Sequence, residues 1–115
     1  MPSQRFLPAY HVRRPADFRR AYQRRCSAGD GLLLVFGHPN DLPHPRLGLS
    51  VSRKVGGAVV RNRWKRLIRE AFRLTRAQLP VGVDLIVIPR TDAEPELKRL
   101  LESLPRLAAR LAAKL

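Results

Sequence analysis

AVVRNRWKRLIREAFRLTR, residues 58–76, is the most informative segment of the chain, because it combines an apolar stripe with a strong excess of positive charge. At about 100° per residue, one side of a helix over these residues is apolar. That side consists of Val60, Trp64, Leu67, Ile68, Ala71 and Phe72. The pattern predicts a helix whose apolar side packs against a protein core.

The opposite side of this helix is basic. It carries Asn62, Lys65, Arg66, Arg69, Arg73 and Arg76, which we call the basic ridge, and Arg61 and Arg63 flank the apolar side. Glu70 is the one acid against seven Lys or Arg in residues 58–76. Like charges three or four residues apart repel by about 0.2–0.5 kcal/mol per pair. A polyanion would relieve this repulsion, which favours RNA or DNA binding over a solvated face or an anionic membrane surface.

The composition supports a polyanionic partner. A chain of 115 residues is expected to form one domain with a single modest core. Its 23 basic and 9 acidic residues give a net charge of +14. Residues 1–76 hold 17 Lys or Arg and 4 acids, whereas residues 77–115 hold 6 and 5. We therefore interpret the last third of the chain as scaffold.

Cysteine usage and hydropathy favour a cytoplasmic protein. Cys26 is the only cysteine, so an internal disulfide is excluded and a reducing compartment fits. No apolar run reaches the ~20 residues of a membrane span. The apolar stretch after Arg5 is too short for a signal peptide. We expect no membrane association.

The remaining segments predict an α+β fold in the order α-β-β-α-β-α. Pro15 suits the first turn of a helix over residues 15–26. Apolar runs and alternation predict strands over residues 32–37, 46–52 and 83–88. A loop over 27–31 is expected between the first helix and the first strand, and a loop over 38–45 between the first two strands. A small sheet with helices packed against it is therefore expected.

The two ends of the chain are predicted to be simpler. Residues 1–12 read as an extended arm within a single RNA-binding domain over residues 1–115. Leucine spacing predicts a helix over 94–104, and Pro105 marks a break or a new first turn before a C-terminal helical extension over 105–115. Gly56-Gly57 is interpreted as a flexible hinge in preference to a phosphate-binding loop, because no G-x-x-x-x-G-K-[ST] pattern follows. An additional short strand near residues 54–58 is compatible with the sequence.

Phe18 and Tyr22 fall on one face of the first predicted helix, at a spacing of four residues. Two interpretations stay open. Both rings can belong to the core, or they can form a platform on which RNA bases stack, worth about 1–3 kcal/mol per base. A similar choice applies to the strand over 46–52, where Gly48, Ser50 and Ser52 form a small, polar face that suits either a ligand or close helix packing.

Residues 52–73, SRKVGGAVVRNRWKRLIREAFR, resemble the signature of the bacterial ribonuclease P protein subunit, a Lys and a Gly-rich link followed by R-N-R-x-K-R. The similarity extends upstream through PRLGLSVSRK and covers most of residues 8–105. It implies the fold of the second domain of ribosomal protein S5, with a left-handed βαβ crossover. The general rule for such crossovers predicts the opposite hand.

The resemblance also implies a function and its partners. In this family the RNA subunit performs the hydrolysis with bound Mg²⁺ and removes the 5′ leader of precursor tRNA. The protein binds that substrate and supports the metal sites from outside, in a one-to-one complex with the catalytic RNA. The implied enzyme is an endoribonuclease whose chemistry resides in RNA.

Site residues follow from the positions that match the family motif. The basic motif that contacts the RNA subunit corresponds to Arg61, Asn62, Arg63, Lys65, Arg66 and Arg69, and the ridge pattern adds Arg73. The implied leader cleft has aromatic residues at Phe18, Tyr22 and Phe36 and a basic pair, Arg53 and Lys54, at its edge. Tyr22 stands where Phe is commoner, and Arg14 stands where an N-capping polar residue is usual.

No catalytic or metal site is predicted from the protein side chains. His11, His38 and His44 have no Cys or carboxylate partner at ligand spacing, and the nine acids are scattered. Charge and size alone fit a ribosomal or other structured-RNA protein equally well. A nonspecific DNA-compacting protein fits less well, because it leaves the arginine-framed aromatic helix unexplained.

Overall fold

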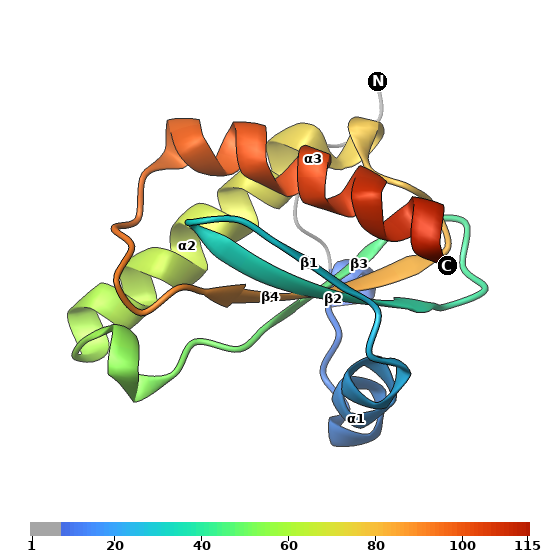
Figure 1. Ribbon diagram of the computed structural model, residues 1–115, viewed down its shortest axis with the longest axis horizontal. Coiled ribbons are helices and arrows are strands. Elements are labelled where there is room, and N and C mark those ends of the chain that lie inside the picture. The colour runs from blue at the N-terminus through green and yellow to red at the C-terminus, as the bar shows by residue number, and fades with distance from the viewer. Residues whose placement is uncertain (1–7) are drawn as a thin grey trace.

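The computed structural model describes residues 8–115, which form a mixed sheet with helices on both faces (Figure 1). The strands are β1 (Ser27–Gly29), β2 (Leu33–Pro39), β3 (Arg46–Leu49) and β4 (Val83–Pro89), in the order β1-β2-β4-β3. The α-helices are α1 (Pro15–Arg24), α2 (Ala58–Thr75) and α3 (Leu97–Lys114). Short 3-10 helices are η1 (Pro8–Tyr10), η2 (Arg53–Val55) and η3 (Arg76–Gln78).

The register of the sheet assigns each strand residue to one of two faces. β2 is antiparallel to β1 and β4, whereas β3 runs parallel to β4. Because side chains alternate along a strand, Leu33, Val35, Leu47, Leu85 and Val87 share one face, which α2 and α3 cover. Phe36 and Ile86 lie on the other face, where α1 packs. The main core therefore lies between the sheet and the pair α2 and α3.

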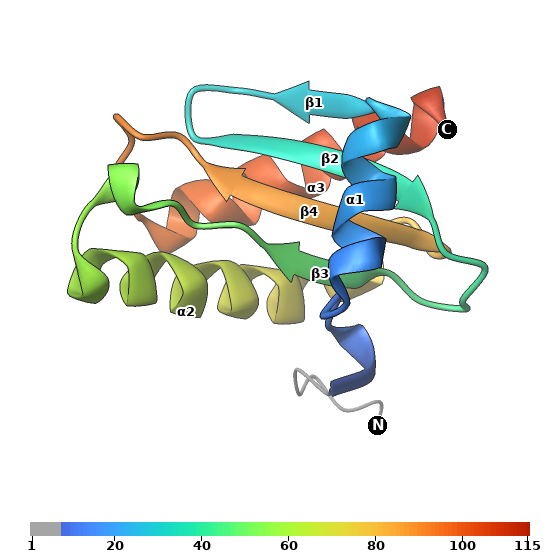
Figure 2. The same ribbon diagram turned by 90° about the horizontal axis from the view of Figure 1, so that it is seen from below.

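The connection from β3 through α2 to β4 is left-handed. Figure 2 shows both strands running toward the left, with α2 on the far side of the sheet and β4 above β3. This hand is opposite to the general rule for parallel strands. It agrees with what the family resemblance implies.

The two long helices supply most of the core. α2 buries Trp64, Ile68, Ala71, Phe72 and Thr75, and α3 buries Leu100, Ser103, Leu104, Leu107, Ala108 and Leu111. Full burial of one large apolar side chain stabilises a fold by about 1.5–3 kcal/mol. The apolar stripe is thus confirmed as the core-facing side of α2 from Trp64 to Phe72, with Leu67 partly buried against the same core, whereas Val60 in the first turn is exposed.

Three local predictions are wrong. Residues 27–29 form the edge strand β1 and not a loop, because their backbone pairs with residues 34–36 of β2. Residues 53–55 form η2 and not a strand, with the Ser52 hydroxyl accepting a hydrogen bond from the Lys54 N–H at 3.3 Å. α3 continues through Pro105, because the buried leucines on both sides of it hold one continuous helix against the sheet.

The predicted N-terminal arm is only partly described by the structure. Residues 1–7 lie outside the described residues. Residues 8–10 form η1 and are not extended. Val12 then donates its N–H to the Leu47 carbonyl at 2.9 Å, which fixes this segment beside β3.

Candidate nucleic-acid interface

α2 presents the basic ridge on its solvent side, as the periodicity predicts. Asn62, Arg63, Arg66 and Arg69 are exposed, while Lys65 and Arg73 are half-buried. Arg61 is also half-buried, and its Nε has no hydrogen-bond partner within residues 8–115. The helix begins after Gly57 with no side-chain cap and no acid in its first turn. Its first amide N–H groups therefore add partial positive charge beside Arg61 and Arg63.

Glu70, the one acid of α2, forms an ion pair with Arg73. Glu70 accepts hydrogen bonds from Nη2 and Nε of Arg73, the latter at 3.3 Å. These hydrogen bonds hold the pKa of the Glu70 carboxyl below its usual range. Arg63, Arg66 and Arg69 have no carboxylate within salt-bridge distance in the described part of the chain. The positive charge of the ridge is therefore largely uncompensated.

The C-terminal end of the ridge has a different role. The Arg76 guanidinium lies 4.2 Å from the centroid of the Tyr10 ring, a cation–π contact. Tyr10 also meets the His44 ring edge-on at 4.9 Å. Next to Tyr10, burial and the charges of Arg13 and Arg69 lower the pKa of His11. Arg76 thus ties η1 to the end of α2, and His11 lies near the ridge.

The three predicted aromatic residues come together between α1 and the sheet. Tyr22 of α1 and Phe36 of β2 make an edge-to-face contact, with centroids 5.1 Å apart at 84°. They and Phe18 are half-buried and pack around the buried residues Val12, Ala21 and Ile86. We call Phe18, Tyr22 and Phe36 the aromatic cluster. Its rings pack against a small core, as the core interpretation predicts, while part of their surface remains accessible, and the stacking interpretation stays a prediction.

Gly48 explains the small face of β3. A Cβ at this position would lie 3.1 Å from Cζ of Phe18 and 2.6 Å from Cδ1 of Ile86. Gly48 therefore permits α1 to approach the sheet closely. At this residue the choice left open by the sequence falls to close helix packing.

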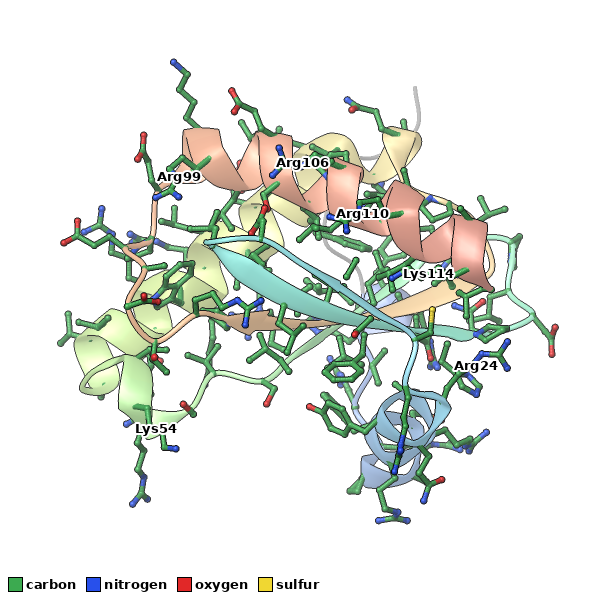
Figure 3. The ribbon with its side chains drawn as sticks, viewed as in Figure 1. Arg24, Lys54, Arg99, Arg106, Arg110 and Lys114 are labelled. Carbon is green, nitrogen blue, oxygen red and sulfur yellow. The ribbon has the colours of Figure 1, made fainter. Side chains whose placement is uncertain are left out.

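Arg53 and Lys54 lie on η2, between β3 and α2, and both are exposed. Figure 3 shows Lys54 projecting on the same side of the sheet as α1. The basic pair therefore stands at the end of the ridge and at the border of the sheet face that carries the aromatic cluster. The backbone at Gly56, with a φ of 147°, makes the turn from η2 into α2.

A buried ion pair that sequence reasoning missed holds α1 and the loop after β2 in place. Arg46 donates to both carboxylate oxygens of Asp84, at 2.7 and 2.6 Å, and lies 3.6 Å from Asp17 of α1. Asn40 donates to the same carboxylate at 2.8 Å. Hydrogen bonding to Asp84 raises the pKa of Arg46. Arg46 and Asp84 are 38 residues apart, so no local pattern could reveal the pair.

Among residues 8–115, no three His, Cys, Asp or Glu side chains converge into a group that could hold a metal ion. In the same residues, no helix is both long and apolar enough to cross a bilayer.

Fold and surface together describe a small, strongly basic α+β protein with a cationic helix and an aromatic cluster on opposite faces of one sheet. The family model for ribonuclease P matches residues 6–112. The chain is 46% identical over 89 residues to the ribonuclease P protein component of Methylococcus capsulatus, across 76% of this chain and 69% of that protein. It is 39% identical over 103 residues to the component of Photobacterium profundum, across 85% and 86%.

Solved structures give the same result. The RNase P protein from Thermotoga maritima superposes with a TM-score of 0.79 at 31% identity, covering 87% of this chain and 96% of that one. The RNase P protein of Staphylococcus aureus gives a TM-score of 0.76 at 35% identity, covering 90% and 94%. This chain belongs to the ribonuclease P protein family. Membership implies a component of a ribonuclease complex that acts in tRNA processing.

Proposed function

We propose that this protein is the ribonuclease P subunit that binds the catalytic RNA and the 5′ leader of precursor tRNA, and so promotes Mg²⁺-dependent removal of the leader. The observation that carries the proposal is the uncompensated basic ridge on α2, in a chain of this family. The complex contains one protein for each catalytic RNA and acts in the cytoplasm.

The ridge binds RNA through phosphates. Its side chains are chiefly guanidinium groups on the outer side of a helix, which suit phosphate oxygens. The first two turns of α2 carry Arg61, Asn62, Arg63 and Lys65, and the positive end of the helix dipole adds to the charge of Arg61. Arg66, Arg69 and Arg73 extend the contact along the helix.

The aromatic cluster and η2 hold the leader. An extended single strand exposes its bases, and the accessible parts of Phe18, Tyr22 and Phe36 offer surfaces for stacking. Arg53 and Lys54 contact phosphates of the same strand at the border of this face. The leader is thereby gripped between the aromatic rings and the start of the ridge.

The RNA subunit carries out the hydrolysis and binds most of the Mg²⁺. The described side chains offer no converged donor set for a resident metal ion. The contribution of the protein is instead positive charge, which stabilises the compact, metal-binding form of the RNA. No protein side chain takes part in the bond cleavage.

The ridge is tested with the double variant Arg66→Ala/Arg69→Ala. For single-stranded RNA the slope of log affinity against log salt is about 0.7 per phosphate contacted, so losing two contacts flattens it by roughly 1.4. Affinity for the catalytic RNA and the slope are measured for wild type, the double variant and Lys98→Gln, which removes an exposed charge from α3. If affinity and slope are unchanged in the double variant, the ridge is ruled out as an RNA-binding surface.

Identity of the RNA is tested in cells. Purification of the tagged protein is expected to recover one dominant noncoding RNA together with precursor tRNA. Recovery of ribosomal RNA as the dominant species contradicts the proposed function, because it assigns the charge and the helix to a ribosomal partner.

A further inference from the structure

Four cations of α3 lie on one side of this helix, next to β1. Figure 3 shows Arg99, Arg106, Arg110 and Lys114 following the length of α3. At 100° per residue, their directions fall within about 40° of that of Arg110. Nζ of Lys114 donates to the Ser27 carbonyl at 2.6 Å, and Arg106 contacts Asp30 at 2.7 Å, which places this side against the β1 edge. The near-neutral charge count of residues 77–115 conceals this segregation.

A hollow at the end of this side gathers cations from two helices. Its lining consists of Arg20, Gln23, Arg24, Arg25, Cys26, Ser27, His38 and Lys114, with no acid among them. Arg20 is paired with Asp17 at 3.3 Å. Within residues 8–115, no carboxylate lies within salt-bridge distance of Arg24, Arg25, Arg110 or Lys114. We call these four residues the β1-edge surface.

Arg25 shows that this charge is kept at a structural cost. Its backbone is left-handed, with a φ of 58° and a ψ of 21°, and its N–H donates to the Tyr22 carbonyl at 3.1 Å. This is the position after a helix at which glycine is favoured, because a side chain there strains the backbone. The helix dipole favours a cation at the end of α1, which offsets part of this cost.

The β1-edge surface and the basic ridge lie at opposite edges of the molecule. β1 and β3 are the two edge strands of the sheet, and α2 runs along the β3 edge while α3 packs over β1 and β2 (Figures 1 and 2). The molecule measures 36 × 35 × 24 Å. A straight segment of RNA that lies along the ridge therefore does not reach the β1-edge surface.

We propose that the β1-edge surface binds the phosphate backbone of a second, base-paired segment of RNA. No Phe, Tyr or Trp lines the hollow, and its charged groups suit phosphate oxygens, so a base-paired segment, which exposes its phosphates and keeps its bases stacked, fits this surface better than a single strand. The exposed large apolar residues of the described chain, Leu42, Val59, Val60, Leu74 and Val81, all lie elsewhere, which disfavours a membrane surface. The proposal rests on the proposed function for its class of ligand, but not on the residues of the ridge.

The first test measures binding of a short fluorescein-labelled RNA duplex of mixed sequence. The edge variant is Arg25→Gly/Arg110→Gln, and the matched control is Lys98→Gln, which removes a charge from the far side of α3. We expect the edge variant to bind more weakly, with a salt slope lower by about 2, one for each lost phosphate contact. Its melting temperature stays near that of wild type, because glycine fits the left-handed position while the loss of two cations near helix ends acts in the opposite direction.

The same comparison is made in the ridge variant Arg66→Ala/Arg69→Ala. This design tests RNA binding by the β1-edge surface independently of RNA binding by the ridge. An edge effect that persists in the ridge variant supports the proposal even if the ridge itself has no effect. Duplex binding by the edge variant equal to that of Lys98→Gln overturns it. A loss of binding to phosphatidylserine vesicles with duplex binding unchanged overturns it in favour of a membrane surface.

The second test uses the wild-type protein. Cys26 is the only cysteine and lines the hollow. Saturating RNA duplex is expected to slow its alkylation by N-ethylmaleimide, in wild type and in the ridge variant alike, as followed by mass spectrometry. Alkylation at an unchanged rate in the presence of bound duplex contradicts the proposal.

Discussion

Asp30 is the residue that joins the turn after β1 to α3. Its carboxylate accepts hydrogen bonds from the Leu32 and Leu33 N–H groups, each at 2.8 Å, from Arg106 at 2.7 Å and from the Ser103 hydroxyl. Burial alone would raise the pKa of Asp30, but these hydrogen bonds outweigh it and lower the pKa to about 2. The ionised form is therefore the one that the fold stabilises.

Asp30→Asn is expected to destabilise the protein at neutral pH by on the order of 2 kcal/mol, since a pKa unit corresponds to about 1.4 kcal/mol. The folded pKa is depressed, so this contribution is present above the unfolded pKa near 4 and is lost as pH falls toward about 2. Urea unfolding of both proteins across this range measures the difference. The difference in unfolding free energy between the two proteins is expected to disappear on acidification. A difference that does not depend on pH contradicts the stabilising role of the ionised Asp30 carboxylate.

Gly48→Ala tests the close approach of α1 to the sheet. The added methyl group would meet Ile86, which is buried, and the ring of Phe18, so we expect a loss of about 1–3 kcal/mol through overpacking. Gly31→Ala is the matched control, because nothing lies within 4 Å of its Cβ position. Equal unfolding free energies for the two variants would show that α1 moves away at no cost.

At the scale of elements, sequence patterns suffice where an element carries its own apolar signal. Helical periodicity predicts α2, alternation predicts β3, and continuous apolar runs predict β2 and β4. β1 has three residues, too few for any period, and its existence depends on pairing with β2. Continuity of α3 through Pro105 was also missed, because the packing of leucines on the sheet outweighs a proline's local preference.

α1 carries the next prediction, which separates the two roles of its aromatic residues. In Phe18→Leu and Tyr22→Leu, apolar burial is kept while stacking on a base is lost. Tyr22→Leu also loses the edge-to-face contact with Phe36, at a cost of about 0.5–1.5 kcal/mol. We expect weaker binding of precursor tRNA with a leader, unchanged binding of mature tRNA, and a small decrease in melting temperature.

Binding of mature tRNA is the control for this prediction. Because mature tRNA lacks the leader, a general loss of folding would weaken both complexes equally. A large fall in melting temperature without selective loss of precursor binding would assign both rings to the core alone.

At the scale of the whole molecule, charge is divided between two edges of one sheet. The count of 17 basic against 4 acidic residues places most of the excess positive charge in positions 1–76, which contain the ridge. The count of 6 against 5 in positions 77–115 hid the cations of α3, because a sum over sequence cannot show that α3 places Arg106, Arg110 and Lys114 on one side. Helical periodicity over residues 97–114 reveals this segregation, but its position beside β1 is visible only in the folded chain.

The final prediction concerns how a protein without a catalytic constellation assists a ribonuclease. If it supplies positive charge to the folded RNA and grips the leader, it lowers the Mg²⁺ concentration needed for cleavage, and excess cation partly replaces it. Precursor tRNA is incubated with RNA alone, protein alone and both together across a magnesium titration. We expect the largest gain from protein at low magnesium and a shrinking gain as magnesium rises. The Arg66→Ala/Arg69→Ala variant is expected to shift the curve toward that of RNA alone.

Equal cleavage rates with and without protein at low magnesium would refute the claim that the protein assists the RNA. Cleavage by protein alone, after ribonuclease pretreatment and removal of that ribonuclease, would place the chemistry in the protein and overturn the mechanism.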